Sequence, residues 1–129
     1  MQQITVKTKK NIEFIDITDK VKKIVKNSGI GSGICMVYVP HTTAAVTVNE
    51  SADVNVQTDM IRKLDDLVPL HDNYSHIEGN SAAHLKSSLI GASETFIVEN
   101  NTLILGRWQG IFFCEFDGAR ERKILISVR

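Results

Sequence analysis

Three of the four histidines occupy positions where side chains often do chemistry. His41 follows a predicted strand, His76 lies in a polar loop, and His84 falls in the first turns of a predicted helix. Binding groups concentrate in loops and at the ends of elements. Three neutral imidazoles with one open position form the ligand set of catalytic zinc, although imidazole also suits other transition metals. The pattern predicts a divalent metal site of zinc type. The alternative is that these histidines are surface residues or hydrogen-bonded core residues.

The segment between His76 and His84 contains features that suit a ligand. Gly79 lets the backbone approach a bound molecule closely. The helix expected to begin after Asn80 offers free N–H groups and the positive end of its dipole to an anion. Glu78 is a candidate proton carrier beside them.

A second polar segment follows the strand that begins after His41. Asn49 and Glu50 close this strand, and Asp53 comes three residues later. We expect both carboxylates near one end of the sheet, close to His41 across a pair of strands. Glu50 could orient a ligand or carry a proton. Asp53 could be catalytic, or it could cap the helix that follows.

Two further segments have unusual composition. Glycines bracket Trp108 and Gln109 within a β region, and glycine in a strand often marks a bulge or a close backbone approach. For Trp108, a place in the core is the simpler explanation. Arg120 and Arg122 follow a turn and could hold a phosphate or carboxylate, or they could be solvated charges.

The elements that must position these residues alternate between paired strands and single helices. Strands are predicted at residues 2–9, 12–17, 33–39, 44–48, 95–98, 103–105, 111–116 and 123–128, and helices are predicted at residues 18–28, 54–68 and 81–90. Because the helices fall between pairs of strands, we expect an α+β fold with a mostly antiparallel sheet and about three helices. The run Ile111–Cys114 is apolar on both faces, so it is predicted to be a central strand or a strand at a subunit interface.

Length and charge limit the function. The chain has 129 residues, which suits a single domain spanning 1–129. Its formal net charge is zero, so no nucleic-acid or anionic-membrane partner is expected. The first residues alternate polar and apolar types without a hydrophobic signal core. Cys35 and Cys114 are predicted to be reduced thiols, which indicates a cytoplasmic protein.

Three motifs together resemble the YjbQ family. The first is residues 41–50 (His-Thr-Thr-Ala-Ala-Val-Thr-Val-Asn-Glu), the second is His76-x-Glu-Gly-Asn with residues 83–91, and the third is residues 105–111 continuing to residues 114–118. They occur in the family's order across essentially the whole chain. Two departures stand out: Arg107 replaces the usual threonine before the tryptophan, and Ala119 replaces a common proline. If position 107 faces the pocket, substrate preference could differ.

The resemblance implies a compact α+β domain, a homotrimer, and a histidine-lined pocket that holds a metal. It also implies a weak, secondary thiamine-phosphate synthase activity. We therefore expect an enzyme, a transferase acting on a small phosphorylated compound. A metal-dependent hydrolase and a non-catalytic metabolite-binding protein are the alternatives. The predicted site comprises His41, His76 and His84 as metal ligands, Glu50, Asp53, Glu78 and Arg120 as catalytic groups, and Asn49, Gly79, Asn80, Trp108 and Gln109 as substrate contacts.

Overall fold

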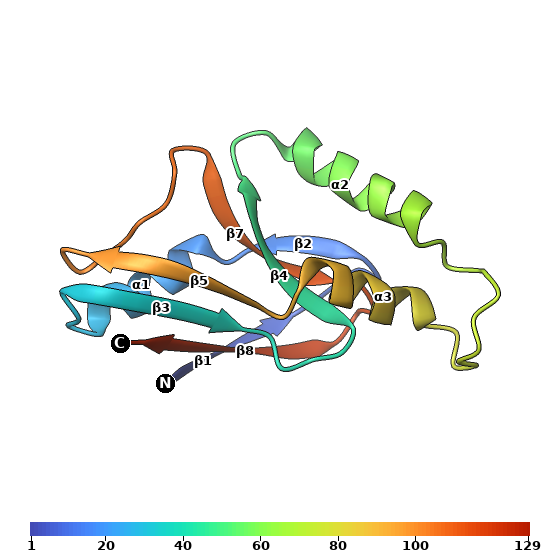
Figure 1. Cartoon of the computed structure of the whole chain (residues 1–129), viewed down its shortest axis with the longest axis horizontal. Helices are drawn as coiled ribbons and strands as arrows, with labels where there is room; N and C mark the ends of the chain where they lie inside the picture. The colour runs from blue at the N-terminus through green and yellow to red at the C-terminus, as the bar shows by residue number, and fades with distance from the viewer.

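Two antiparallel sheets form the framework of the protein, and the computed structural model describes all of residues 1–129. The larger sheet has the order β1-β8-β3-β5-β6. Its strands are β1 (Gln2–Lys7), β8 (Glu121–Val128), β3 (Ser32–Tyr38), β5 (Ser93–Glu99) and β6 (Thr102–Leu103). The smaller sheet has the order β2-β7-β4, from β2 (Glu13–Asp16), β7 (Gln109–Glu115) and β4 (Ala44–Glu50). Both termini lie at the same end of the larger sheet (Figure 1).

The main core lies between the two sheets and the first helix, α1 (Thr18–Asn27). Cys35 and Val37 enter it from β3, and Ile111 and Phe113 enter it from β7. Cys114, on the other face of β7, belongs to a second, smaller cluster. The prediction of a central strand covered on both faces is therefore confirmed for β7.

Two further helices follow β4. The helix α2 spans Val54–Leu67, and α3 spans Ser81–Ile90. α3 packs beside β4, and Ala83 joins the smaller cluster. None of the side chains of α2 is buried, and the helix projects away from both sheets (Figure 1). Leu64 of α2 packs against the smaller cluster, whereas the other α2 side chains are partly or fully exposed.

The element types agree with the α+β prediction, and one hairpin agrees in detail. Asn100 and Asn101 both have positive φ, at 52° and 57°. This conformation suits the two-residue turn that joins twisted antiparallel strands. Val98 pairs with Leu103 across it.

One expected strand pair is absent. β3 and β4 flank residues 39–43, as predicted, but they belong to different sheets. The turn at His41 carries the chain from one sheet to the other, so β4 runs away from β3. This difference decides which residues can meet at a site.

Candidate functional site

His41 lies at the crossing between the two sheets and is held by the larger one. Its Nε2 accepts a hydrogen bond of 2.9 Å from the backbone N–H of Lys123 on β8. Burial, together with the positive charge of Arg122, lowers the pKa of His41 below its usual 6.5. Accepting the hydrogen bond also requires a lone pair on Nε2. His41 is therefore neutral at pH 7, with its proton on Nδ1.

This lowered pKa predicts a measurable pH dependence. The unfolded chain takes up a proton at His41 more readily than the folded chain as the pH falls below about 6.5, so stability is lost there. We expect the melting temperature to fall less between pH 7.5 and 5.5 in His41→Gln than in the wild type. His71→Gln is the matched control, because His71 is exposed. Equal slopes for His41→Gln and the wild type would contradict the assignment.

His76 and His84 lie next to each other. Their ring centroids are 5.4 Å apart, in an edge-to-face arrangement. Nδ1 of His76 lies 2.9 Å from the Ser81 hydroxyl, and its Nε2 lies 3.7 Å from a Glu78 carboxylate oxygen. His84 is fixed by α3, since it stands one turn after Asn80. The loop before α3 thus folds back onto the start of that helix and brings the two histidines together.

A polar cleft connects His84 with His41. It has a volume of about 410 Å³, and none of its lining side chains is hydrophobic. The lining comes from the turn before β4, the start of α3 and the turn before β8; it consists of Pro40, His41, Thr42, Thr43, Glu78, Asn80, His84, Asp117, Arg120 and Arg122. The structure thus brings together five of the predicted site residues: His41, Glu78, Asn80, His84 and Arg120.

Asp117 organises one wall of this cleft. Its Oδ2 accepts hydrogen bonds of 2.9 Å from both the Asn80 amide and the Arg120 guanidinium. Nε of Arg120 also donates to the Asp117 carbonyl at 2.7 Å. The guanidinium is directed by these contacts, yet the Arg120 side chain remains 54% exposed. Its remaining N–H groups can reach a ligand.

A buried ion pair lies beneath the cleft. Glu115 is fully buried, and Arg122 donates to both of its carboxylate oxygens. Thr8 and the backbone N–H of Asp117 also donate to Glu115, at 2.8 and 3.0 Å. Arg122 bonds the Thr43 hydroxyl at 2.9 Å. The pair therefore ties the turn that carries His41 to the turn that carries Asp117.

Sequence reasoning missed the roles of Glu115, Asp117 and Thr43. A usable signal was present for Glu115, because it is a charge within an otherwise apolar run predicted to be buried. Charged residues are almost never fully buried unless they are paired. Its charged partner, Arg122, lies only seven residues along the chain, across the turn between β7 and β8. The contact with Thr8, 107 residues away, could not be identified from spacing.

The three histidines do not form a ready three-ligand set in this chain. No group of three His, Cys, Asp or Glu side chains is arranged to hold a metal ion. His76 and His84 are adjacent, but Nε2 of His41 is engaged by Lys123. The donor geometry therefore does not fit a three-histidine zinc site without rearrangement, and the metal stays a prediction.

Several predicted residues lie at the other end of the smaller sheet. Glu50 pairs with Gln109, and Asn49 pairs with Gly110. Glu50 lies six positions after Ala44, the residue at which β4 begins. At about 3.3 Å per residue this end is roughly 20 Å from the cleft. The expectation that Glu50 and Asp53 lie close to His41 is therefore corrected, because β4 leads away from β3 rather than pairing with it.

That far end has its own local structure. Asp53 caps α2 by accepting a 2.9 Å hydrogen bond from the Asn55 N–H, so the prediction that it caps this helix is confirmed. Gln109 folds back to accept from the Gly106 N–H at 2.7 Å. Trp108 is 54% exposed, and the Arg107 guanidinium lies 4.7 Å from its ring centroid. Trp108 is thus not core, and Arg107 does not face the histidine cleft.

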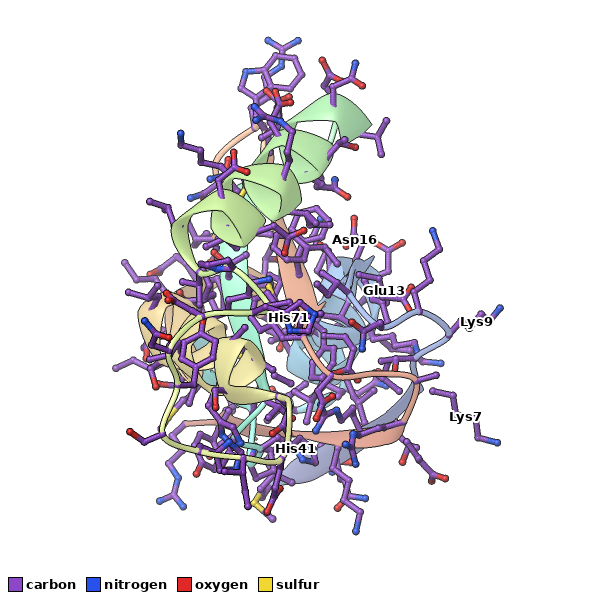
Figure 2. The ribbon with its side chains drawn as sticks, turned by 90° about the vertical axis from the view of Figure 1, so that its right-hand side faces the viewer. Lys7, Lys9, Glu13, Asp16, His41 and His71 are labelled. Atoms are coloured by element: carbon purple, nitrogen blue, oxygen red, sulfur yellow. The ribbon has the colours of Figure 1, made fainter.

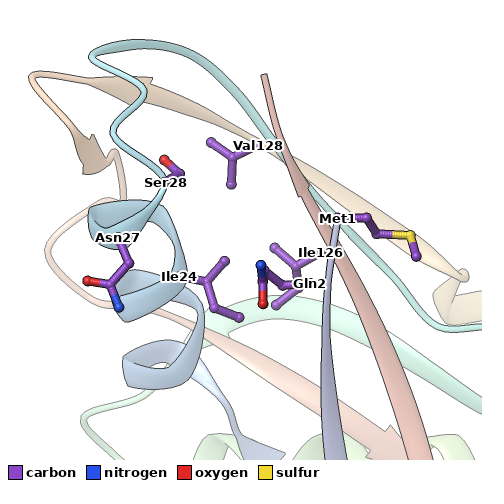
Figure 3. Close-up of a pocket in the computed structure, with 7 residues that line it drawn as sticks. All are labelled: Met1, Gln2, Ile24, Asn27, Ser28, Ile126 and Val128. Carbon is purple, nitrogen blue, oxygen red and sulfur yellow. The ribbon is translucent and has the colours of Figure 1, made fainter.

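Other features are separate from the cleft. His71 lies on the loop after α2, apart from His41 (Figure 2). A cavity of about 230 Å³ between α1 and the β1–β8 edge is lined by Met1, Gln2, Ile24, Asn27, Ser28, Ile126 and Val128, and no lining side chain is ionisable (Figure 3). None of the three helices has the length and apolar character that crossing a membrane requires.

Known proteins resemble this chain over its full length. The family model for UPF0047, YjbQ-like proteins, matches residues 2–129. The UPF0047 protein YugU of Bacillus subtilis is 50% identical, covering 99% of this chain and 98% of its own. A UPF0047 protein of Methanocaldococcus jannaschii is 47% identical over 95% of this chain and 89% of its own. A crystal structure of an uncharacterised YjbQ/UPF0047 protein from Clostridium acetobutylicum is 47% identical, with a TM-score of 0.98 and full coverage of both chains.

Proposed function

Because this chain belongs to the YjbQ-like UPF0047 family, we propose that it is an enzyme that binds a small phosphorylated compound in the cleft between His41, His84 and Arg120. The observation that carries the proposal is the cleft itself. None of the residues that line it is hydrophobic. Arg120 lies in its wall, bound to Asp117, and the Arg120 side chain is 54% exposed. A planar guanidinium matches the oxygen spacing of a phosphate.

The start of α3 adds further donors. Asn80 occupies the position before the helix, yet its side chain bonds Asp117 and leaves the first turn without a side-chain cap. The first backbone N–H groups of a helix lack partners within the helix. An anion at this edge of the cleft would receive them.

Directed hydrogen bonds, rather than net charge, would hold the phosphate. The formal charges of Arg120 and Arg122 are balanced by those of Glu78 and Asp117 among the residues that line the cleft. Arg122 is further neutralised by Glu115 beneath it. We therefore expect modest affinity for free phosphate and a preference for larger phosphorylated ligands.

Proton transfer is assigned to His84. His84 lines both the cleft and the neighbouring hollow beside His76, and its ring packs against the His76 ring in a T-shaped arrangement. Glu78 could accept a proton next, since it lines the same cleft and lies 3.7 Å from His76. Glu50 and Asp53 have no part in this scheme within one chain.

Arg120→Gln tests the phosphate site. We expect the dissociation constant for inorganic phosphate, measured by calorimetry, to rise about 10- to 100-fold, which corresponds to the loss of a charge-assisted hydrogen bond. Arg107→Gln is the matched control, because Arg107 is exposed at the far end of the sheet. Equal phosphate affinity in wild type and Arg120→Gln would refute the proposed site.

One assay distinguishes three functions: a thiamine-phosphate synthase side activity, a metal-dependent hydrolase and a binding protein. Pyrophosphate release from a pyrimidine pyrophosphate with a thiazole phosphate supports the transferase. Phosphate release from simple phosphoesters, dependent on added Zn²⁺, supports the hydrolase. Binding without turnover of any of these supports the metabolite-binding alternative. Zinc itself would be checked by elemental analysis of tag-free protein.

We also propose that the chain assembles as a homotrimer. Support comes from apolar surface that one chain leaves uncovered. Ile34, Met36, Tyr38 and Ile97 are all at least 44% exposed on one face of the larger sheet, with Ile34 directly opposite Ile97. α2 has no buried side chain. Contiguous apolar surface of this kind marks interaction sites.

Ile97→Lys tests this assembly. Ile97 is 63% exposed, so the single chain should fold, while a charge in an apolar interface should not be tolerated. Light scattering at micromolar concentration should give the mass of three chains for the wild type and of one chain for Ile97→Lys. Lys22→Glu, on the exposed side of α1, should keep the trimer. A wild-type mass of one chain would refute the proposal.

A further inference from the structure

β1 leaves one edge of the larger sheet open. It is the outermost strand of the order β1-β8-β3-β5-β6 and pairs only with β8. The Thr8 N–H donates to the Arg120 carbonyl, which continues the ladder between β1 and β8. Because successive residues of an antiparallel strand direct their backbone groups to opposite sides, Gln3, Thr5 and Lys7 direct theirs away from β8. These N–H and carbonyl groups are free to pair with a further strand.

The other sheet edges offer less. β6 has two residues and β2 has four, whereas β1 has six. β4 is partly covered, because the Val46 N–H donates to the Gly91 carbonyl and the Ala44 carbonyl accepts from the Ser87 hydroxyl. An unpaired edge is a template on which a strand from another chain can add. β1 therefore offers the longest open edge for an added strand.

A hollow for a side chain lies beside this edge. The cavity of about 230 Å³ between α1 and β1 includes Gln2, Ile24 and Ile126 in its lining, and Ile24 points toward the other two (Figure 3). Its volume is below the roughly 300 Å³ at which small-molecule pockets begin. Side chains of directly opposite residues lie on the same face of a sheet, so a residue added opposite Gln2 would direct its side chain toward this cavity. An apolar side chain suits that position.

The segment that carries this edge is basic, although the whole chain is neutral. Residues 1–27, which include β1, β2 and α1, contain seven lysines and three acidic residues. Lys7 and Lys9 extend into solvent near the end of β1 (Figure 2). Lys20 is exposed one helical turn before Ile24, so it stands on the side of α1 that lines the cavity. Ammonium groups therefore flank the open edge.

This charge selects what can occupy the edge. Lysine on an edge strand disfavours pairing with a second copy of the same edge, because like charges would meet. An acidic strand would instead be attracted. The acidic residues of the segment oppose this little, since Glu13 accepts from the Lys9 and Lys10 N–H groups and Asp16 accepts from Thr18.

We propose that β1 binds an extended, acidic segment of a partner protein as an additional strand of the larger sheet. The backbone of that segment pairs with Gln3, Thr5 and Lys7. Its acidic side chains lie on the face that carries Lys7, and an apolar side chain enters the cavity beside Ile24. The open edge lies in the plane of the sheet, whereas the apolar face assigned to the trimer points out of that plane. The proposal therefore depends neither on the polar cleft nor on the trimer.

A labelled synthetic peptide of about eight residues, in which valine alternates with glutamate, tests this proposal. Fluorescence anisotropy with the full-length wild type should show saturable binding that weakens as salt is added, because salt screens exposed charges. In the proposed pairing the glutamate nitrogens face β1 and the valine nitrogens face away. N-methylation of the glutamates should therefore abolish binding, whereas N-methylation of the valines should preserve it. Equal binding of the two methylated peptides would mean attraction by charge alone and would overturn the proposal.

Thr5→Pro tests the same edge from the side of the protein. It removes the central outward N–H and leaves the ladder with β8 intact, and proline is tolerated in an edge strand at such a position. Peptide affinity should fall at least about 10-fold, whereas Thr5→Val, which keeps the N–H, should bind as the wild type does. Lys7→Glu should also weaken binding, and Lys22→Glu is its control of equal charge on α1. Failure of the folded wild type to bind the unmethylated peptide, or unchanged affinity in Lys7→Glu or in folded Thr5→Pro, would refute the proposal.

Discussion

Glu115→Ala is expected to lower the free energy of unfolding by about 3–5 kcal/mol, because it leaves a buried arginine without its counter-charge. Arg122 is only 5% exposed and donates to both oxygens of Glu115. Chemical denaturation followed by far-UV circular dichroism measures the loss. Glu121→Ala serves as the control, because Glu121 is an exposed glutamate on β8.

The same pair predicts sensitivity to acid. Burial alone would raise the pKa of Glu115, but hydrogen bonds from Arg122, the Asp117 N–H and Thr8 outweigh it and hold the pKa below the ordinary value of 4.5. A depressed carboxylate pKa stabilises the fold above about pH 4.5, and this stabilisation is lost as the pH falls through the folded pKa. The wild type should therefore lose stability below that pH more steeply than Glu115→Ala.

A double replacement separates the charge from the packing. Glu115→Leu with Arg122→Met replaces the pair by apolar side chains, an exchange that is often neutral for stability. We expect this variant to recover most of the stability lost in Glu115→Ala, but to lose phosphate affinity because the cleft is no longer organised. A Glu115→Ala variant as stable as the wild type would contradict the role of the pair.

The sequence predicted the elements well because their signals are local. Apolar periodicity, the Asn100–Asn101 turn and the Asp53 cap each depend on residues within a few positions, and the structure has all three. The predicted pairing of β3 with β4 failed because proximity along the chain was taken for pairing. The five-residue connection at His41 instead carries the chain into the other sheet, and no local pattern specifies that choice.

The candidate site was predictable only in part for the same reason. His76 and His84 meet because they flank the start of one helix, which spacing could suggest. His41 meets Lys123 on β8, 82 residues away, and this long-range contact engages one of its two ring nitrogens. The residues at the far end did not join the site because β4 and β7 extend about 20 Å between the two ends; they are Asn49, Glu50, Asp53, Trp108 and Gln109.

Removal of His84 should have the largest effect on chemistry. As the cleft histidine assigned to proton transfer, its replacement in His84→Ala should lower turnover by about 10²- to 10⁴-fold. Bound metal, if the folded protein carries it, should fall by at least about 10-fold, the loss typical of even an outer partner of a metal site. Folding should survive, because His84 is only partly buried and truncating such a polar side chain costs only about 1 kcal/mol.

Asp53→Ala is the matched control for His84→Ala. Its carboxylate accepts from the Asn55 N–H, so the variant should lose about 0.5–2 kcal/mol of stability and match the wild type in zinc binding and turnover. Steady-state kinetics, elemental analysis and melting curves on both proteins give opposite patterns if the roles are as assigned. Full turnover in His84→Ala would remove His84 from the chemistry. Loss of turnover in Asp53→Ala at an unchanged melting temperature would instead place the chemistry at the far end of β4, where Asp53 and Trp108 lie.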